Sequence, residues 1–488
     1  MEEKNSQNRQ DLFKNRSSSK EFLLSKAELR PWRKTKKKKE DGEKDIVNKL
    51  FPGTQSGEAF IEHAMKILSS YLAFGAIVIR VDNMNEGEDS QKPGDIEDSR
   101  RRADGESSPH GKSSVFNLLA NPAASSGECA RVSVQKMLGD TVKAIDYICK
   151  TGNGFWGRMD RFLFGCYLPD KNASSCLKLA VKLKKSLESL GEGTVTTGIA
   201  AYPAFSYRKQ DIIANAGKAL DHADYFGPGS IVAFDAVSLN ISGDKLYHDG
   251  DIEGAIKEFK MALLFDPDDV NVHNSLGVCY GVLEDFQKAI REFKECIRLS
   301  PKEVMPLYNA GLIYQLTGKK EKALKNFQKA GKLEEELFEI DFQTGKLFLE
   351  LGKPEEGREY LEKALKLKPE SSVALFHLGE SFVATGLMDE AEASYEKAIK
   401  INPNDAASLS SLGWLYNQKD KNRDVALAFC RQSVEIDPGN GLFRQRLGRL
   451  YMKLGLPEEA LRELKKAEKL NCESCHYIQM IQSGKYEE

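Results

Sequence analysis

The chain has 488 residues, of which 30% are charged and 41% hydrophobic. This length indicates two or more domains, and this composition excludes a wholly disordered chain. The net charge of −2 gives no argument for a nucleic-acid partner, and no apolar run is long enough to span a bilayer. The N-terminus lacks the apolar core of a signal peptide, and the nine cysteines are scattered, so we expect a cytoplasmic protein.

Residues 1–50 are rich in lysine, serine, asparagine and glutamate, and we expect them to be disordered. A basic run extends from Arg33 to Lys39 within this tail. Such a run could contact an acidic partner, RNA or anionic lipid, and the plainer interpretation is a solvated tail.

Residues 51–235 have the alternating pattern of an α/β domain. Apolar periodicity predicts helices at 59–70, 132–149, 174–190 and 212–225, and strands at 76–79, 161–167, 194–201 and 230–234. Residues 85–113 are a low-complexity stretch that we expect to form a disordered insertion. Strands that alternate with helices favour a sheet covered by helices.

A 34-residue period runs through residues 236–472. Its clearest marks are the glycines Gly243, Gly277, Gly311, Gly345, Gly379 and Gly413, followed after one inserted residue by Gly448. A large apolar residue follows most of these glycines after three positions, and a small residue follows after twelve. Each period is typical of two short amphipathic helices, so we expect seven stacked repeats and a capping helix in 473–488.

This pattern resembles the tetratricopeptide repeat (TPR). The resemblance implies an all-α superhelical solenoid whose concave face binds an extended segment or a helix of a partner protein. The family's groove positions, the fifth and ninth of each repeat, fall here on Asn274, Val278, Tyr308, Leu312, Phe342, Lys346, Phe376, Glu380 and Trp414. These residues lack the Lys/Asn pattern that clamps a terminal carboxylate, so an apolar or amphipathic segment is expected. The alternative is that several of the rings pack between repeats.

The α/β region has its own resemblance. Gly139-Asp140-Thr141-Val142, the strand Thr194–Ala200 and the late helix Ala216–Ala223 are similar to segments of the diguanylate cyclase (GGDEF) domain. The likeness spans about 180 residues, from 54 to 235, and implies an α/β domain with the fold of that family.

The functional positions of that family are where this chain departs from it. Aligned without a gap, the five signature residues of the family fall on Asp160–Phe164. A second alignment places the D-E-F of the signature on Asp160-Arg161-Phe162. In both alignments the chain lacks the glycines and the metal-binding acid. The other metal aspartate maps to Arg80, with Asp82 matching the second family aspartate. Phosphoryl transfer in this family depends on metal ions, so we expect no catalysis and no cofactor. Asp140 matches a guanine-contacting aspartate; the alternative is a helix-start residue.

Three functions therefore stay open at this stage. The first is a non-catalytic scaffold that captures a partner protein with its repeats. The second is a regulator that binds a guanine nucleotide or cyclic di-GMP without turning it over, and the third is an active cyclase. Two further motifs, Gly105–Ser113 and Cys472–His476, resemble a phosphate-binding loop and a haem-attachment site, but their spacing or context does not fit.

Overall fold

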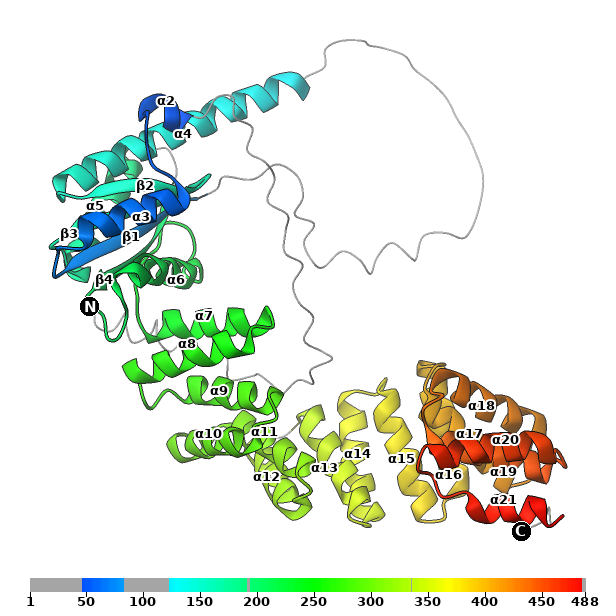
Figure 1. Ribbon diagram of the computed structural model, residues 1–488. Helices are drawn as coiled ribbons and strands as arrows, with labels where there is room; N and C mark the ends of the chain where they lie inside the picture. Colours follow the sequence, from blue (N-terminus) through cyan, green and yellow to red (C-terminus); the bar gives the residue numbers. More distant parts are fainter. Residues whose placement is uncertain (1–45, 83–122, 191–193, 335, 485–488) are drawn as a thin grey trace, which may run out of the picture. The chain divides into compact units, whose positions relative to one another are not determined.

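The computed structural model describes residues 46–82, 123–190, 194–334 and 336–484 (Figure 1). The predicted insertion at 85–113 and most of the predicted tail lie outside these ranges. Two compact units divide the chain between Asp269 and Val270. This division lies one helix pair beyond the predicted domain boundary at 235, and the two units are described separately.

The N-terminal unit contains a five-stranded sheet in the order β2-β3-β1-β4-β5. Its strands are β1 (Phe74–Val81), β2 (Phe155–Asp160), β3 (Leu163–Pro169), β4 (Val195–Tyr202) and β5 (Ile231–Ala233). The central strand β1 pairs antiparallel with β3 and β4, whereas β4 and β5 are parallel. Nearly every residue of β1 is buried, as its continuous apolar run predicts for a strand covered on both faces.

Strand β2 was absent from the sequence prediction, which placed a single strand at 161–167. The structure instead has a β2–β3 hairpin that turns at Arg161 and Phe162. Strand β2 was missed because it carries Gly157, which weakens a strand pattern. A Cβ at Gly157 would lie only 2.3 Å from the ring of Phe60, so the glycine lets that ring pack against the strand.

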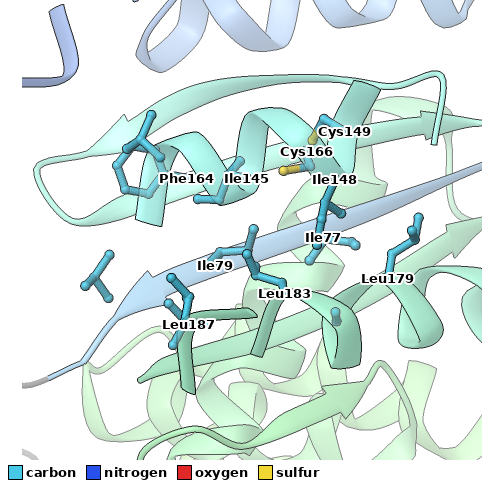
Figure 2. Packing of buried hydrophobic residues seen from close by; sticks show 14 of the residues in the cluster. Ile77, Ile79, Ile145, Ile148, Cys149, Phe164, Cys166, Leu179, Leu183 and Leu187 are labelled. Atoms are coloured by element: carbon cyan, nitrogen blue, oxygen red, sulfur yellow. The ribbon is translucent and has the colours of Figure 1, made fainter. Parts of the chain in front are cut away.

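Helices cover both faces of the sheet. They are α2 (Ile46–Leu50), α3 (Gly57–Leu68), α4 (Ala123–Thr151), α5 (Ala173–Leu190) and α6 (Ile212–Asp224), with the short 3-10 helix η1 (Lys209–Asp211) before α6. Ile145 of α4 and Leu183 of α5 pack with Ile77 on one face (Figure 2). Phe60 of α3 and Ile213 of α6 belong to the core on the other face. Helix α2 falls inside the predicted disordered tail, and its five residues are too few to show a period.

The first predicted repeat belongs to this unit as α7 (Ala236–His248) and α8 (Ile252–Phe265). Asp235 caps α7 by accepting a hydrogen bond from the amide of Ser238 at 2.8 Å. Lys218 of α6 forms a half-buried ion pair with Glu258 of α8 at 2.8 Å. The pair α7–α8 is therefore fastened to the sheet through α6.

The C-terminal unit contains the remaining six helix pairs and the predicted final helix. The pairs are α9 (Val270–Val282) and α10 (Phe286–Leu299), α11 (Val304–Leu316) and α12 (Lys320–Leu333), α13 (Phe338–Glu350) and α14 (Pro354–Leu367), α15 (Ser372–Ala384) and α16 (Met388–Ile401), α17 (Ala406–Gln418) and α18 (Arg423–Ile436), and α19 (Gly441–Lys453) and α20 (Pro457–Lys469); the final helix is α21 (Cys475–Gln482). Each second helix packs against its own first helix and against the first helix of the next pair (Figure 1).

The repeated glycine sets the distance between the two helices of a pair. A Cβ on Gly277 would lie 2.6 Å from the ring of Phe293, and one on Gly311 would lie 2.5 Å from the ring of Phe327. Both rings are fully buried. The ring of one helix therefore lies directly on the backbone of the other, which only glycine permits.

We expect Gly311→Ala to destabilise the C-terminal unit by about 1–3 kcal/mol, because the new methyl group overlaps a ring that has no room to move. Gly331→Ala on the adjacent α12 is the matched control. Its Cβ would contact only Ile340 at 3.4 Å, so the substitution should be neutral or stabilising by up to about 1 kcal/mol. Denaturant midpoints measure both effects, and equal midpoints for the two variants would contradict this packing.

Candidate functional site

The first helices of the C-terminal unit form one continuous face of the stack. Helix α11 contacts α9, α15 contacts α13 and α19 contacts α17, in addition to the contacts within each pair. First helices that touch across successive pairs must lie on the shorter, inner face of the stack. We call this surface the inner face, and it carries all nine residues that the sequence analysis assigned to partner binding.

The nine residues fall into two groups. Asn274, Val278 and Tyr308 are buried, while Leu312, Phe342, Lys346, Phe376, Glu380 and Trp414 are half-buried. The prediction that all nine line an open groove is therefore not met at the first three positions. Asn309 donates a hydrogen bond to Asn274 at 3.2 Å, and Tyr308 packs on Phe327 with ring centroids 5.7 Å apart. Asn274 therefore packs between repeats, as the alternative interpretation predicts, whereas Tyr308 packs against the second helix of its own repeat.

Aromatic side chains gather on the inner face of α13 and α15. The ring of His377 lies 5.6 Å from Phe342 and 5.1 Å from Phe376, and Phe376 in turn lies 5.9 Å from Tyr395. Burial lowers the pKa of His377 to about 4, and the charge of Lys346 acts in the same direction. His377 is therefore a neutral ring at physiological pH and extends the apolar surface that Phe342 and Phe376 form.

A charged network lies next to these rings. Glu380 accepts hydrogen bonds from the hydroxyl groups of Tyr395 and Ser411. Ser411 also accepts from Nη1 of Arg446 at 3.0 Å, so one hydroxyl links the carboxylate to the guanidinium. Burial lowers the pKa of Arg446 from its usual value, while Glu380 opposes that shift. The network holds one negative and one positive charge in fixed positions on a half-buried surface.

Sequence analysis missed the arginines of this surface. The guanidinium of Arg449 stacks on Trp414 at 4.3 Å and on Tyr477 of α21 at 4.6 Å. Arg449 stands at the ninth position of the seventh repeat once the inserted residue is allowed for, so the same rule could have found it. Arg446 stands at the sixth position, where the preceding repeats carry His377 and Ser411. A search restricted to positions five and nine does not reach it.

The depressed pKa of His377 makes stability depend on pH. The folded pKa of about 4 lies below the unfolded value of about 6.5, so between these values the unfolded chain binds more protons. The contribution is complete above about pH 6.5 and is lost as the pH falls toward 4. We expect wild type to lose about 1–2 kcal/mol more than His377→Gln between about pH 7 and pH 5. Denaturation at both values measures this, with exposed His476→Gln as the control; parallel profiles for wild type and His377→Gln would contradict the assignment.

In the N-terminal unit, the end of β1 carries an arginine in a fixed ion pair. Arg80 binds both carboxylate oxygens of Asp224, with Nη1 2.8 Å from Oδ2. This bond raises the pKa of Arg80 above its usual value. Asp82, which is 5% exposed, accepts hydrogen bonds from Thr194 Oγ1 at 2.9 Å, Thr196 Oγ1 at 2.7 Å and the Gly229 amide at 2.8 Å. Both carboxylates are thus already engaged by donors of the protein itself.

Asp140 lies in the interior of α4, so the alternative that it starts a helix is wrong. Its carboxylate forms an ion pair with Lys143 at 3.0 Å. Neighbouring Gly139 faces α2, where Leu50 Cδ1 would lie 3.3 Å from an added Cβ. Phe51, which follows α2, packs edge-on against Trp156 at 5.3 Å. Helix α2 therefore lies against α4 next to Asp140, while Phe51 packs on β2.

Two arrangements that could suggest chemistry are structural. His222 Nδ1 lies 3.2 Å from Ser238 Oγ and 3.3 Å from Asp235 Oδ1, so both groups approach the same nitrogen. A catalytic triad needs the histidine between the other two groups, and here Asp235 and Ser238 form a helix cap. Across the described ranges, no group of three or more histidine, cysteine or acidic side chains could hold a metal ion. None of the described helices is both long and apolar enough to cross a membrane.

Comparisons with known proteins address the repeat region. Models described as tetratricopeptide repeat match residues 270–303, 306–336, 342–406, 394–426 and 419–474, and a model described as TPR repeat matches 243–281. This part of the chain consists of tetratricopeptide repeats. The sequence prediction of the repeats is therefore confirmed, and all of these matches lie between residues 243 and 474.

Solved structures with a similar fold cover parts of the chain. YrrB, described as a TPR protein with an unusual peptide-binding site, is 22% identical, with a TM-score of 0.34 over 38% of this chain and 95% of its own. The MamA protein is 26% identical, with a TM-score of 0.33 over 35% of this chain and 93% of its own. A tetratricopeptide repeat protein from Parabacteroides merdae is 20% identical, with a TM-score of 0.41 over 51% and 97%. No curated protein sequence matches the chain.

Proposed function

We propose that this protein is a non-catalytic scaffold that holds a segment of a partner protein on the inner face of its TPR repeats. The observation that carries the proposal is the half-buried surface of α13, α15 and α17. There Phe342 and Phe376 lie around His377, Tyr395 joins Phe376 to the linked charges of Glu380 and Arg446, and Trp414 stacks with Arg449. Large aromatic side chains around fixed polar groups are the composition of binding anchors.

The expected ligand is an amphipathic segment. Its apolar side chains would contact the rings of Phe342 and Phe376, and its polar groups would meet Glu380 and Arg446. A helix or an extended segment that alternates apolar and polar side chains satisfies both requirements. A wholly apolar segment would remove the remaining solvent from Glu380 and Arg446 and offer them no polar group in exchange, which is costly.

We further propose that the sheet domain has a cyclase-like fold without cyclase chemistry. Support comes from the end of β1, where the resemblance implies a metal-binding aspartate and the chain has Arg80 bound to Asp224. A cation fixed at this place repels magnesium, and Asp82 is occupied by three hydrogen-bond donors. Without that chemistry the protein would be no enzyme and would need no cofactor. We also propose a cytoplasmic location, because the nine cysteines are scattered.

The purified protein should form no cyclic dinucleotide from GTP with magnesium or manganese, as measured by mass spectrometry of the reaction products. Product formation that is lost in an Asp82→Asn variant with native circular dichroism would show that the acid takes part in chemistry, and the scaffold proposal would then fail in this domain.

The nucleotide-responsive regulator is the alternative, and thermal shift separates it from the scaffold. GTP and cyclic di-GMP should leave the melting curve unchanged, because Ile46 and Leu50 of α2 lie against Gly139, next to Asp140. A ligand-dependent rise in melting temperature that disappears in Asp140→Asn would favour the regulator instead.

The partner site is tested by a double substitution on the inner face. Phe376→Ala with Trp414→Ala should weaken partner capture about 30-fold or more, since each buried interface ring contributes about 1–2 kcal/mol or more. Leu333→Ala with Leu367→Ala, at exposed positions on the second helices α12 and α14, is the matched control. Quantitative capture from cell extract compares the two with wild type.

Circular dichroism decides how a loss of capture is interpreted. A native spectrum with lost capture supports the inner face as the site. Retained capture by the Phe376/Trp414 double variant excludes the inner face, and an unfolded spectrum shows that the rings serve packing.

A further inference from the structure

A second surface with a distinct chemistry lies on the second helices, away from the inner face. A groove of ≈ 480 Å³ runs between the ends of α14 and α16 and has α15 as its floor. Leu375 and Leu378 form this floor, with Leu365 and Ile401 at its sides. Ile401 is 42% exposed, although it stands beside buried leucines. The groove thus offers apolar contact that the described parts of the chain do not cover.

Three lysines surround this groove. Lys366 comes from α14, and Lys397 and Lys400 come from α16, while Glu362 is the single acidic residue of the lining. None of the three ammonium groups forms an ion pair within the described ranges. A lysine in the last turn of a helix interacts favourably with the helix dipole. This effect explains one lysine per helix, but it does not explain why apolar residues form the floor between the lysines.

Neighbouring grooves along the 34-residue period lack this combination. In the next groove, Gln432 and Glu435 replace Lys397 and Lys400, so the positive rim is lost. In the preceding groove, Asp341 and Thr344 replace Leu375 and Leu378, so the apolar floor is lost. The groove between α10 and α12 repeats the basic rim with the smaller Ala310 in place of Leu378. The basic rim and the apolar floor therefore vary independently from one repeat to the next, and both are present between α14 and α16.

We propose that this groove binds an acidic peptide segment of a partner protein, with an aliphatic side chain placed over Leu375 and Leu378 and carboxylates near the three lysines. Charge complementarity selects an anionic ligand. A single-stranded nucleic acid is disfavoured because no aromatic ring lines the groove, and base stacking needs one. The site is independent of the inner face, so either proposal can fail without the other.

The probe is a short fluorescein-labelled peptide of aspartate and glutamate around two central leucines, and the readout is fluorescence anisotropy with the full-length protein. We expect saturable binding that weakens with salt, and about tenfold weaker binding for Lys366→Gln/Lys397→Gln/Lys400→Gln. The exposed lysines of α5 supply the matched control, Lys178→Gln/Lys182→Gln/Lys185→Gln, which should bind as wild type does. Phe376→Ala with Trp414→Ala should also leave this affinity unchanged.

The apolar floor is tested separately. Ile401→Ser should weaken binding of the leucine peptide several-fold and leave binding of a peptide with serines at those positions unchanged. No saturable binding, an equal loss in both lysine variants, or equal affinity for the two peptides would each overturn the proposal. Tighter binding of a single-stranded oligonucleotide that is lost in the Lys366/Lys397/Lys400 variant would overturn it in favour of nucleic acid.

Discussion

The contact on which the solenoid depends is that between an aromatic ring of a second helix and the backbone of a first helix at a glycine. In each of four helix pairs a glycine of the first helix faces an aromatic ring of the second, as Gly243 faces Phe259 and Gly379 faces Tyr395. The close approach lets the ring bury its whole area between the helices, which contributes about 1.5–3 kcal/mol per large side chain. In the other three pairs the glycine faces Leu361, Cys430 or Leu464, so the glycine recurs in every pair even where the ring does not. The close approach of the two helices therefore repeats along the stack.

The sequence predicted those features of the structure that residues close together in the chain determine. The repeats and the final helix were predicted correctly, because spacing within one period specifies them. Strand β2 was missed because Gly157 interrupts its pattern, and α2 because five residues are shorter than two helical turns. A search for apolar periodicity does not detect an element whose pattern is interrupted by a single residue or is shorter than the period it needs.

The candidate site could be predicted only in part. Sequence position selected Phe376, Glu380 and Trp414, which are half-buried on the inner face. It could not separate them from Asn274 and Tyr308, because burial there arises from contacts with other helices, Asn309 of α11 for Asn274 and Phe327 of α12 for Tyr308. Nor could it find that Ser411 joins Glu380 to Arg446, since those residues come from three different helix pairs. Such a network exists only once the pairs are stacked.

Tyr395 ties the core of one pair to the surface of the site. Its ring occupies the place that Phe293 and Phe327 hold in other pairs, and its hydroxyl group fixes the carboxylate of Glu380. Where phenylalanine holds that place, the inner face can change by mutation without disturbing the helix spacing. At Tyr395 the two properties share one side chain, so evolution cannot alter the charge geometry of this pair and its packing separately. Divergence in partner choice should therefore proceed faster at α13 and α17 than at α15.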